Sequence, residues 1–181
     1  LVETSVDNGD GTFTYNVPVR EGYTWSDGSP ITANDWEFTF DTVKNLSLGG
    51  NFLSSYPYSC EDEEGTAKNC VVSVVASDDY TVSITFNYDP GLSTWQYGTA
   101  QGIAFSKAYW EQYATDKETL YAHDATNAPV ASAFVYDKLE QGAFYTWKYD
   151  ANTMWYGGTT TIYDGGGTSL DWDNGKAPAF S

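Results

Sequence analysis

The stretch Trp25-Ser-Asp-Gly-Ser-Pro-Ile-Thr-Ala-Asn-Asp35-Trp-Glu-Phe-Thr-Phe40 joins a tight turn to the start of a helix. Asp27-Gly28 is a turn dipeptide. Thr32 stands three residues before Asp35, which is the spacing of a capping box and predicts that the helix begins at Ala33.

Apolar residues recur along this predicted helix at steps of four and three. Trp36, Phe40 and Val43 would therefore lie in one stripe. We expect the stripe to pack against a sheet as core and not to form a ligand cage.

The remaining chain is rich in predicted strands, with a few short helices. Alternation and turn signals predict strands over residues 13–19, 71–76, 80–88, 133–140 and 143–150. Helices are expected over 33–45, 107–114 and 117–122, the last two with Ser106 and Asp116 as N-caps. Pro18 indicates a position near a sheet edge. Antiparallel strands with helices on one face predict an α+β domain.

Composition excludes several classes of partner. The 181 residues include 25 acidic and 8 basic ones, for a net charge of −17. Such a surface repels phosphate backbones, so we expect no nucleic-acid binding. No window approaches eighteen consecutive apolar residues, so no transmembrane segment is expected. The acidity suits a secreted protein or a salt-adapted host equally.

The chain starts at Leu1 with no basic or apolar leader. Either a signal peptide has been removed or a piece of a longer chain is being read, and both options fit an exported protein.

Cys60 and Cys70 flank a polar, acidic loop. We expect a disulfide between them, which would contribute about 2 to 3 kcal/mol by the chain-entropy estimate. The alternative is two unpaired thiols in a cytosolic protein. Two cysteines and one distant histidine cannot make a structural zinc site.

Enzyme chemistry finds little support. His123 is the only histidine, and no Gly-x-Ser-x-Gly elbow accompanies it, so we expect an exposed loop residue. A glycosidase needs two carboxylates, but so acidic a chain contains many, and their presence therefore does not indicate a glycosidase. Gly165-Gly-Gly-Thr-Ser169 lacks the lysine of a phosphate-binding loop. We therefore expect no catalytic residue and no cofactor.

Two turns gather oxygen ligands, Asp7-Asn-Gly-Asp-Gly11 and Asp171-Trp-Asp-Asn-Gly175. Neither continues to the acidic residue that a twelve-residue EF-hand loop requires. No metal site is expected, although weak surface calcium binding stays open.

Four stretches, in order, resemble the family 5 solute-binding proteins of ABC importers, which bind oligopeptides and dipeptides. Arg20-Glu-Gly22 through Thr32-Ala-Asn-Asp35 is similar to the family's Arg-x-Gly, aromatic-Ser-Asp-Gly, Thr-Ala-x-Asp pattern. The other three are the strand Val74–Phe86 with Asp89-Pro90 after it, the helix entry Ala104-Phe-Ser-Lys107, and Ala151-Asn-Thr-Met-Trp155-Tyr-Gly-Gly158.

The resemblance implies one lobe of a periplasmic-binding-protein-like fold of type II, cluster C, because family members are several times longer. Residues 1–158 would form the lobe, and residues 159–181 a loop or linker rich in Gly, Thr and Asp. It also implies a non-enzymatic, extracytoplasmic protein, in the periplasm or at the cell surface, with lipid anchoring through a missing N-terminus as one option. Its partners would be a peptide or other small solute and an ABC permease.

For ligand contact the resemblance points to the segment after the first helix, where Tyr56 and Tyr58 are the candidates. The alternative is that Tyr56-Pro-Tyr58 only packs the loop before the Cys60–Cys70 bridge.

A competing hypothesis is a self-contained secreted carbohydrate-binding or adhesive module. The 7 Trp and 15 Tyr residues and the many strands motivate it. It requires about three Trp or Tyr side chains in an exposed, coplanar strip.

Overall fold

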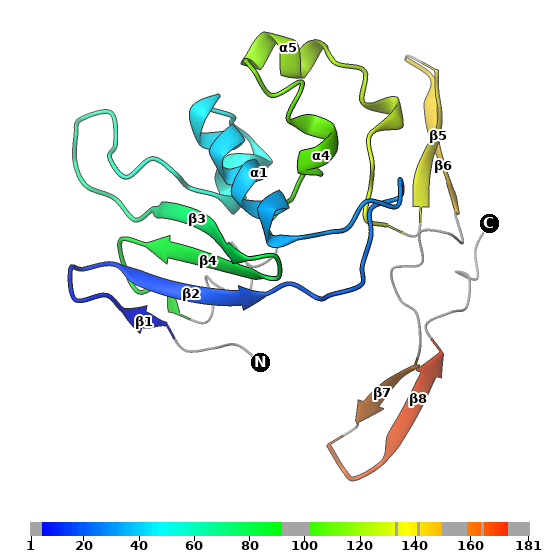
Figure 1. Ribbon diagram of the computed structural model, residues 1–181, viewed down its shortest axis with the longest axis horizontal. Coiled ribbons are helices and arrows are strands. Elements are labelled where there is room, and N and C mark those ends of the chain that lie inside the picture. Colours follow the sequence, from blue (N-terminus) through cyan, green and yellow to red (C-terminus); the bar gives the residue numbers. More distant parts are fainter. Residues whose placement is uncertain are drawn as a thin grey trace. The chain divides into compact units, whose positions relative to one another are not determined.

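The chain forms two units in the computed structural model, which describes residues 5–91, 102–132, 134–140, 142–149, 159–163 and 165–173. The first unit consists of residues 1–22 and 31–124, and the second of residues 23–30 and 125–181. Figure 1 labels their helices and strands.

A four-stranded antiparallel sheet forms the base of the first unit. Its strands are β1 (Val6–Asp7), β2 (Phe13–Pro18), β3 (Val71–Asp78) and β4 (Thr81–Phe86), in the order β1-β2-β4-β3. The hairpin of β3 and β4 was predicted, whereas the two-residue β1 was not. Because β1 pairs only with Phe13 and Thr14, the Pro18 end of β2 lies at an edge, where a residue without N–H is tolerated.

The two faces of this sheet differ in chemistry, as strand alternation requires. Tyr15 pairs with Ile84, which pairs in turn with Val74, and all three are buried. On the other face Ser83 Oγ donates a hydrogen bond to Asn16 Oδ1 at 2.7 Å. The first face is therefore the core side.

A bulge between Val71 and Ser73 keeps β3 consistent with this division. Val71 and Val74 are an odd number of residues apart and would face opposite sides of a regular strand. The extra residue lets both valines be buried on the same side.

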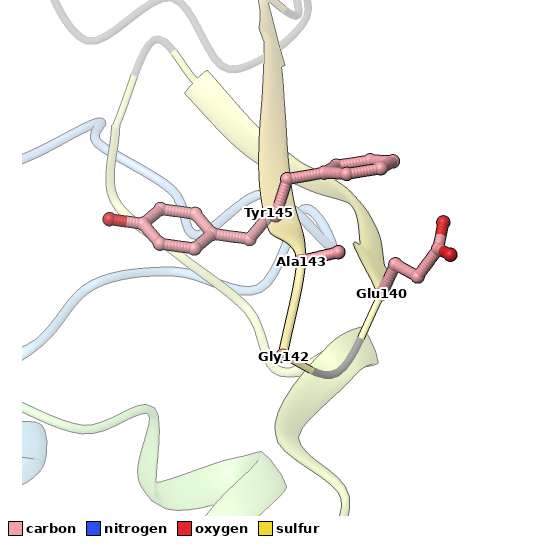
Figure 2. Close-up of a pocket in the computed structure, with 5 residues that line it drawn as sticks. Glu140, Gly142, Ala143 and Tyr145 are labelled. Atoms are coloured by element: carbon pink, nitrogen blue, oxygen red, sulfur yellow. The ribbon is translucent and has the colours of Figure 1, made fainter.

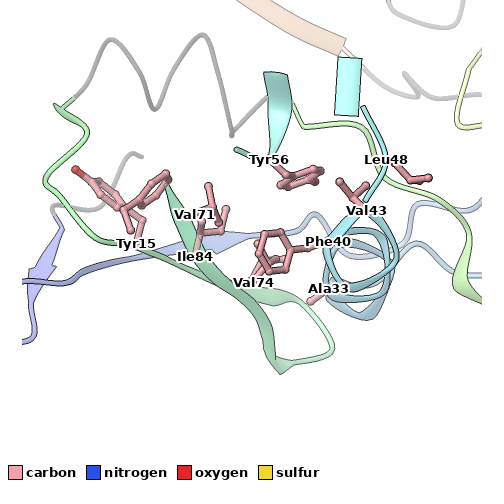
Figure 3. Packing of buried hydrophobic residues seen from close by; sticks show 11 residues of the cluster. Tyr15, Ala33, Phe40, Val43, Leu48, Tyr56, Val71, Val74 and Ile84 are labelled. Carbon is pink, nitrogen blue, oxygen red and sulfur yellow. The ribbon is translucent and has the colours of Figure 1, made fainter. Parts of the chain in front are cut away.

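Helix α1 (Ala33–Asn45) packs on the core side of the sheet, as predicted. Phe40 and Val43 are buried, and Trp36 is partly buried against the same cluster. The capping box is present, with Asp35 Oδ2 accepting the Thr32 N–H at 2.9 Å. Figure 3 shows the cluster between helix and sheet, whose members are Tyr15, Ala33, Phe40, Val43, Leu48, Tyr56, Val71, Val74, Val82, Ile84 and Phe86.

The other helices of the first unit are short. Among the described residues they are α2 (Asn51–Ser55), which was not predicted, α4 (Lys107–Trp110), which ends before the predicted residue 114, and α5 (Lys117–Ala122). Asp116 caps α5 as expected, since its Oδ1 accepts the Thr119 N–H at 2.8 Å. Ser106 occupies the N-cap position of α4, as predicted, although its side chain makes no capping hydrogen bond.

The second unit holds the turn that follows Gly22. Asp27 Oδ1 accepts hydrogen bonds from the backbone N–H and the hydroxyl of Ser29. Ser26 bonds to the distant Val130 twice, through its own N–H and through its hydroxyl oxygen. Ser26 and Asp27 therefore use their polar atoms to hold this loop in place and are not positioned as reactive groups.

The described part of the second unit also contains two hairpins and the short 3₁₀ helix η2 (Ala125–Asn127). The first, β5 (Phe134–Glu140) with β6 (Phe144–Tyr149), was predicted. The second, β7 (Thr159–Tyr163) with β8 (Ser169–Asp173), lies where a loop or linker was expected. Ser169-Leu170-Asp171-Trp172-Asp173 alternates polar and apolar residues, but it stands in a stretch dominated by Gly, Thr and Asp, whose composition indicates a loop. The lobe boundary at residue 158 stays a prediction.

Candidate functional site

Tyr56, one of the two candidate ligand contacts, lies in the core of the first unit. Its side chain is 0% exposed, and its ring packs edge-on against Phe40 at 5.9 Å between centroids. The hydroxyl donates a hydrogen bond to the Ile103 carbonyl at 3.1 Å, and burial raises the pKa of this hydroxyl. Figure 3 shows the ring among Phe40, Val43 and the other apolar side chains. In this structure Tyr56 offers no surface to a ligand, which agrees with the packing alternative.

Tyr58, the other candidate, keeps part of its surface open. It packs against the edge of the core cluster and is only partly buried. Of the two tyrosines it is the one that a solute can reach, and its contact with a ligand remains a prediction.

The predicted disulfide between Cys60 and Cys70 is present, with 5.0 Å between the Cα atoms. Cys70 is fully buried, whereas the loop from Glu61 to Asn69 is exposed. Within the loop, Asp62 Oδ1 accepts hydrogen bonds from the N–H groups of Glu64 and Thr66. The bridge thus ties a turn that has no apolar anchor of its own to the core.

Helix α1 supplies two polar side chains that sequence reasoning did not single out as site residues. Asp35 is 4% exposed, and its Oδ1 accepts the Lys107 N–H at 2.8 Å. Thr39 Oγ1 accepts the Phe105 N–H at 2.7 Å. Together with Tyr56, these residues fix the segment 103–107 at three points. The only signal in the sequence was the place of Asp35 in the capping box, and it does not reveal the hydrogen bond from Lys107.

His123 was expected to be an exposed loop residue, but it belongs to an aromatic cluster. Its ring stacks on Tyr113 at 3.5 Å between centroids, and its Nε2 lies 2.9 Å from the Tyr109 hydroxyl. Trp110 contacts it edge-on. The cluster joins α4 to the end of α5 through ring packing and shows none of the geometry of a catalytic triad.

An open depression lies at the turn of the β5–β6 hairpin in the second unit. Its lining residues are Glu140, Gly142, Ala143, Phe144 and Tyr145. Figure 2 shows the side chains of Glu140 and Tyr145 pointing away from each other. Because these groups do not converge on a common point, the depression has no built ligand site.

The two oxygen-rich turns use their carboxylates within the chain. Asp7 Oδ1 accepts the Gly9 N–H, and Asp10 Oδ1 accepts both the hydroxyl and the N–H of Thr12. These hydrogen bonds, the one from the Thr12 side chain first, lower the pKa of Asp10. Asp171 lies in β8 and accepts the Thr161 hydroxyl, while positions 174 and 175 lie outside the described residues. In the described part of the chain, no three His, Cys, Asp or Glu side chains gather as metal ligands would.

Membrane insertion was also not expected from the sequence. None of the helices in the described ranges combines the length and the apolar character that crossing a bilayer requires.

Comparison with known proteins agrees with the resemblance seen in the sequence. The family model described as bacterial extracellular solute-binding proteins, family 5 Middle, matches residues 1–171. The oligopeptide-binding protein OppA of Bacillus subtilis is 33% identical over 93 residues, which are 48% of this chain and 16% of that protein. The dipeptide-binding protein DppE of the same organism is 32% identical over 75 residues, or 40% of this chain and 14% of that protein.

Solved structures share the fold. The oligopeptide-binding protein AppA of Bacillus subtilis, in complex with a nonapeptide, superposes with a TM-score of 0.57 at 17% identity. NikZ of Campylobacter jejuni, in complex with Ni(L-His), gives 0.55 at 17% identity. Each match covers 84% of this chain but only 28% and 27%, respectively, of the solved one.

The predicted fold class is thus confirmed as an α+β, antiparallel-rich part of such a protein. The chain spans well under a third of the length of the relatives it matches. The family is one of binding proteins and not of enzymes, which agrees with the expected lack of catalytic residues. Because the family model spans residues 1–171, this chain belongs to the family 5 bacterial extracellular solute-binding proteins.

Proposed function

We propose that this chain is part of an extracytoplasmic protein that captures peptides, or another small solute, and delivers them to an ABC permease. The match to the family over residues 1–171 carries this proposal. The names of OppA and DppE support peptides as the solute class. The Ni(L-His) complex of NikZ is the reason for keeping other small solutes in view.

Recognition in the proposed protein comes from closure of two lobes around the solute. Aromatic walls provide apolar burial, and a few fixed polar groups set orientation. Residues 1–158 form part of one lobe in this proposal, and residues 159–181 lead out of it. Tethering by a lipidated cysteine upstream of Leu1, at the periplasmic or outer cell surface, belongs to the same proposal.

Within the lobe we assign different roles to the two tyrosines. Tyr58 is the proposed ligand contact because it remains partly open beside the bridged loop. Tyr56 is a positioning residue in this proposal, since its hydroxyl holds the Ile103 carbonyl.

The test uses the full reading frame that contains these residues, purified and titrated with peptides of two to nine residues by calorimetry. Saturable binding of at least one peptide length is expected. Tyr58→Ala should weaken it several-fold. Tyr121→Ala removes an equally large side chain, 61% exposed on α5, and should leave binding unchanged. Binding of soluble glycans with no response to peptides would overturn the proposal.

One observation keeps the carbohydrate-binding alternative in view. Tyr145, Trp147 and Tyr149 alternate along one face of β6 and are 67%, 51% and 37% exposed. Glycan affinity electrophoresis, with Trp147→Ala as the matched variant, tests it directly. Retardation that depends on Trp147 would favour the alternative.

A further inference from the structure

Helix α1 ends in a turn that carries a modification motif. The turn reads Asn45-Leu46-Ser47, and Asn-x-Ser with x other than Pro is the acceptor pattern for N-linked glycosylation of exported proteins. Asn45 is the only asparagine of the chain with Ser or Thr two residues later. A three-residue pattern arises readily by chance, so the structure around it decides what it means.

The side chains that the motif needs are accessible and unused by the fold. Asn45 is the last residue of α1 and is exposed, and Ser47 is exposed as well. Among the described residues, no hydrogen bond engages the side-chain amide of Asn45 or the hydroxyl of Ser47. Neither side chain therefore has a structural partner that would explain its presence here.

The backbone at Ser47 adopts a conformation that favours glycine. Its φ is +51°, and among the described residues it is the only one besides glycines with a positive φ. The Ser47 N–H donates to the Lys44 carbonyl at 3.2 Å, and the Leu48 N–H donates to the Val43 carbonyl at 2.9 Å. This pair of hydrogen bonds is a Schellman motif, in which the residue at the place of Ser47 is usually Gly.

Contacts on both sides keep the turn in this conformation. Val43 and Leu48 are fully buried in the core cluster (Figure 3). The Lys117 side chain donates a hydrogen bond from Nζ to the Ser47 carbonyl at 3.3 Å. Ser47 is thus held in a strained conformation, and its hydroxyl makes no hydrogen bond that would offset the strain. Residues that depart from the local geometric preference in this way are often functional.

The motif and the geometry make opposite demands on position 47. A glycine there would relieve the strain but would remove the hydroxyl that the acceptor pattern requires. The chain has serine, which satisfies the motif at the expense of the turn. The chain also belongs to a family of extracellular proteins, so it reaches the compartment in which exported proteins are glycosylated.

We propose that Asn45 is an N-glycosylation site and that Ser47 supplies its recognition hydroxyl. In the transfer, Asn45 Nδ2 loses one proton and bonds to the anomeric carbon of the first sugar. The bond between that carbon and a phosphate oxygen of a lipid-linked oligosaccharide breaks, and the lipid phosphate leaves with the electron pair. Transfer takes place on the exported chain before the turn closes. The proposal requires export but does not depend on which solute the protein binds.

Mass spectrometry of the full protein, purified from the organism that encodes it, tests this assignment. After reduction of the disulfide, cleavage behind Glu37 and Glu61 releases residues 38–61, which contain Asn45. We expect this peptide to be heavier than its sequence by a whole number of sugar residues, and fragmentation should place the sugar on Asn45. A peptide that is wholly unmodified, or that carries sugar on Ser47 instead, overturns the proposal.

Substitutions made in the same organism separate the motif from its surroundings. Asn45→Gln and Ser47→Gly should each abolish the modification, whereas Ser47→Thr keeps a hydroxyl and should retain it. Asn51→Gln is the matched control, because Asn51 is exposed but is followed by Leu53 where the motif needs a hydroxyl. It should leave the sugar in place. Sugar that persists on Asn45 in Ser47→Gly overturns the proposal.

Stability gives a second measurement, on protein made in a host without N-glycosylation. Ser47→Gly should raise the melting midpoint by a few degrees, because glycine adopts a positive φ without strain. Ser47→Ala keeps the strain and should not raise it. A lower midpoint for Ser47→Gly would mean that Ser47 serves the fold, and would overturn the role assigned to it. Peptide titration of the same samples reports separately on the proposed function.

Discussion

Asp35 Oδ1 accepts a hydrogen bond from the backbone N–H of Lys107, which lies 72 residues further along the chain, at 2.8 Å. The other carboxylate oxygen accepts the Thr32 N–H. One buried side chain therefore caps α1 and also holds the first residue of α4.

Replacing Asp35 by Asn should lower the free energy of unfolding by about 2 kcal/mol, because one carboxylate oxygen becomes an NH₂ group facing an N–H donor. Urea denaturation followed by circular dichroism measures this. Asp41→Asn on the same helix is the control. Burial, and then the charge of Glu37, raises the pKa of Asp41, so removing its charge should not destabilise the fold. Equal losses in the two variants would contradict the assigned role of Asp35.

Tyr56 should contribute to stability through its ring more than through its hydroxyl. Tyr56→Phe leaves the Ile103 carbonyl without this donor and should cost about 1 kcal/mol. Tyr56→Ala opens a cavity in the core and should cost about 3 to 5 kcal/mol. Equilibrium unfolding of both variants checks the order. If the Tyr56→Ala protein were as stable as the parent, the assignment of Tyr56 to the core would be wrong.

Reducing the disulfide should destabilise the first unit by about 2 to 3 kcal/mol, because the unfolded chain regains the freedom of a short closed loop. Thermal melts with and without a thiol reductant measure the shift. The loop from Glu61 to Asn69 should also become the first site of limited proteolysis. A Cys60→Ser/Cys70→Ser variant that does not respond to the reductant serves as the control.

The cap of α5 should depend on pH. Hydrogen bonds from Thr119, the one from its backbone first, lower the pKa of the Asp116 carboxyl from its usual 3.8. A depressed pKa means that the cap stabilises the folded state at pH values above 3.8 and is lost as the pH falls through the lower folded-state value. The Thr119 amide resonance, followed by NMR in dilute solution, should therefore titrate with a midpoint below 3.8. In Asp116→Asn that titration should vanish.

Local sequence patterns predicted the regular elements well. Thr32 and Asp35 gave the start of α1, and the apolar stripe with Phe40 and Val43 gave its buried face. These features depend on residues close together in the chain, where spacing determines geometry.

Features that depend on distant contacts could not be read in this way. Nothing near Asp35 in the sequence shows that its second oxygen meets Lys107. The burial of Tyr56 depends on α1 and on the segment at Ile103, so its neighbours Pro57 and Tyr58 gave no sign of it. The alternation of Ser169-Leu170-Asp171-Trp172-Asp173 in β8 was obscured by the Gly, Thr and Asp residues around it, which indicated a loop.

The pairing of β5 with β6 contains a bulge between Tyr136 and Lys138, with Asp137 as the extra residue, and this bulge affects how the protein tolerates changes in length. Deleting Asp137 would leave Phe134 and Tyr136 on one face of β5 and Lys138 on the other, so the residues of the hairpin would keep their faces. Deleting a residue from the regular part of β6, such as Thr146, would instead turn half of the strand over. At Asp137 the loss of a residue during evolution would hardly change which side chains share a face of the hairpin. At regular positions of the strands the same change would exchange the two faces.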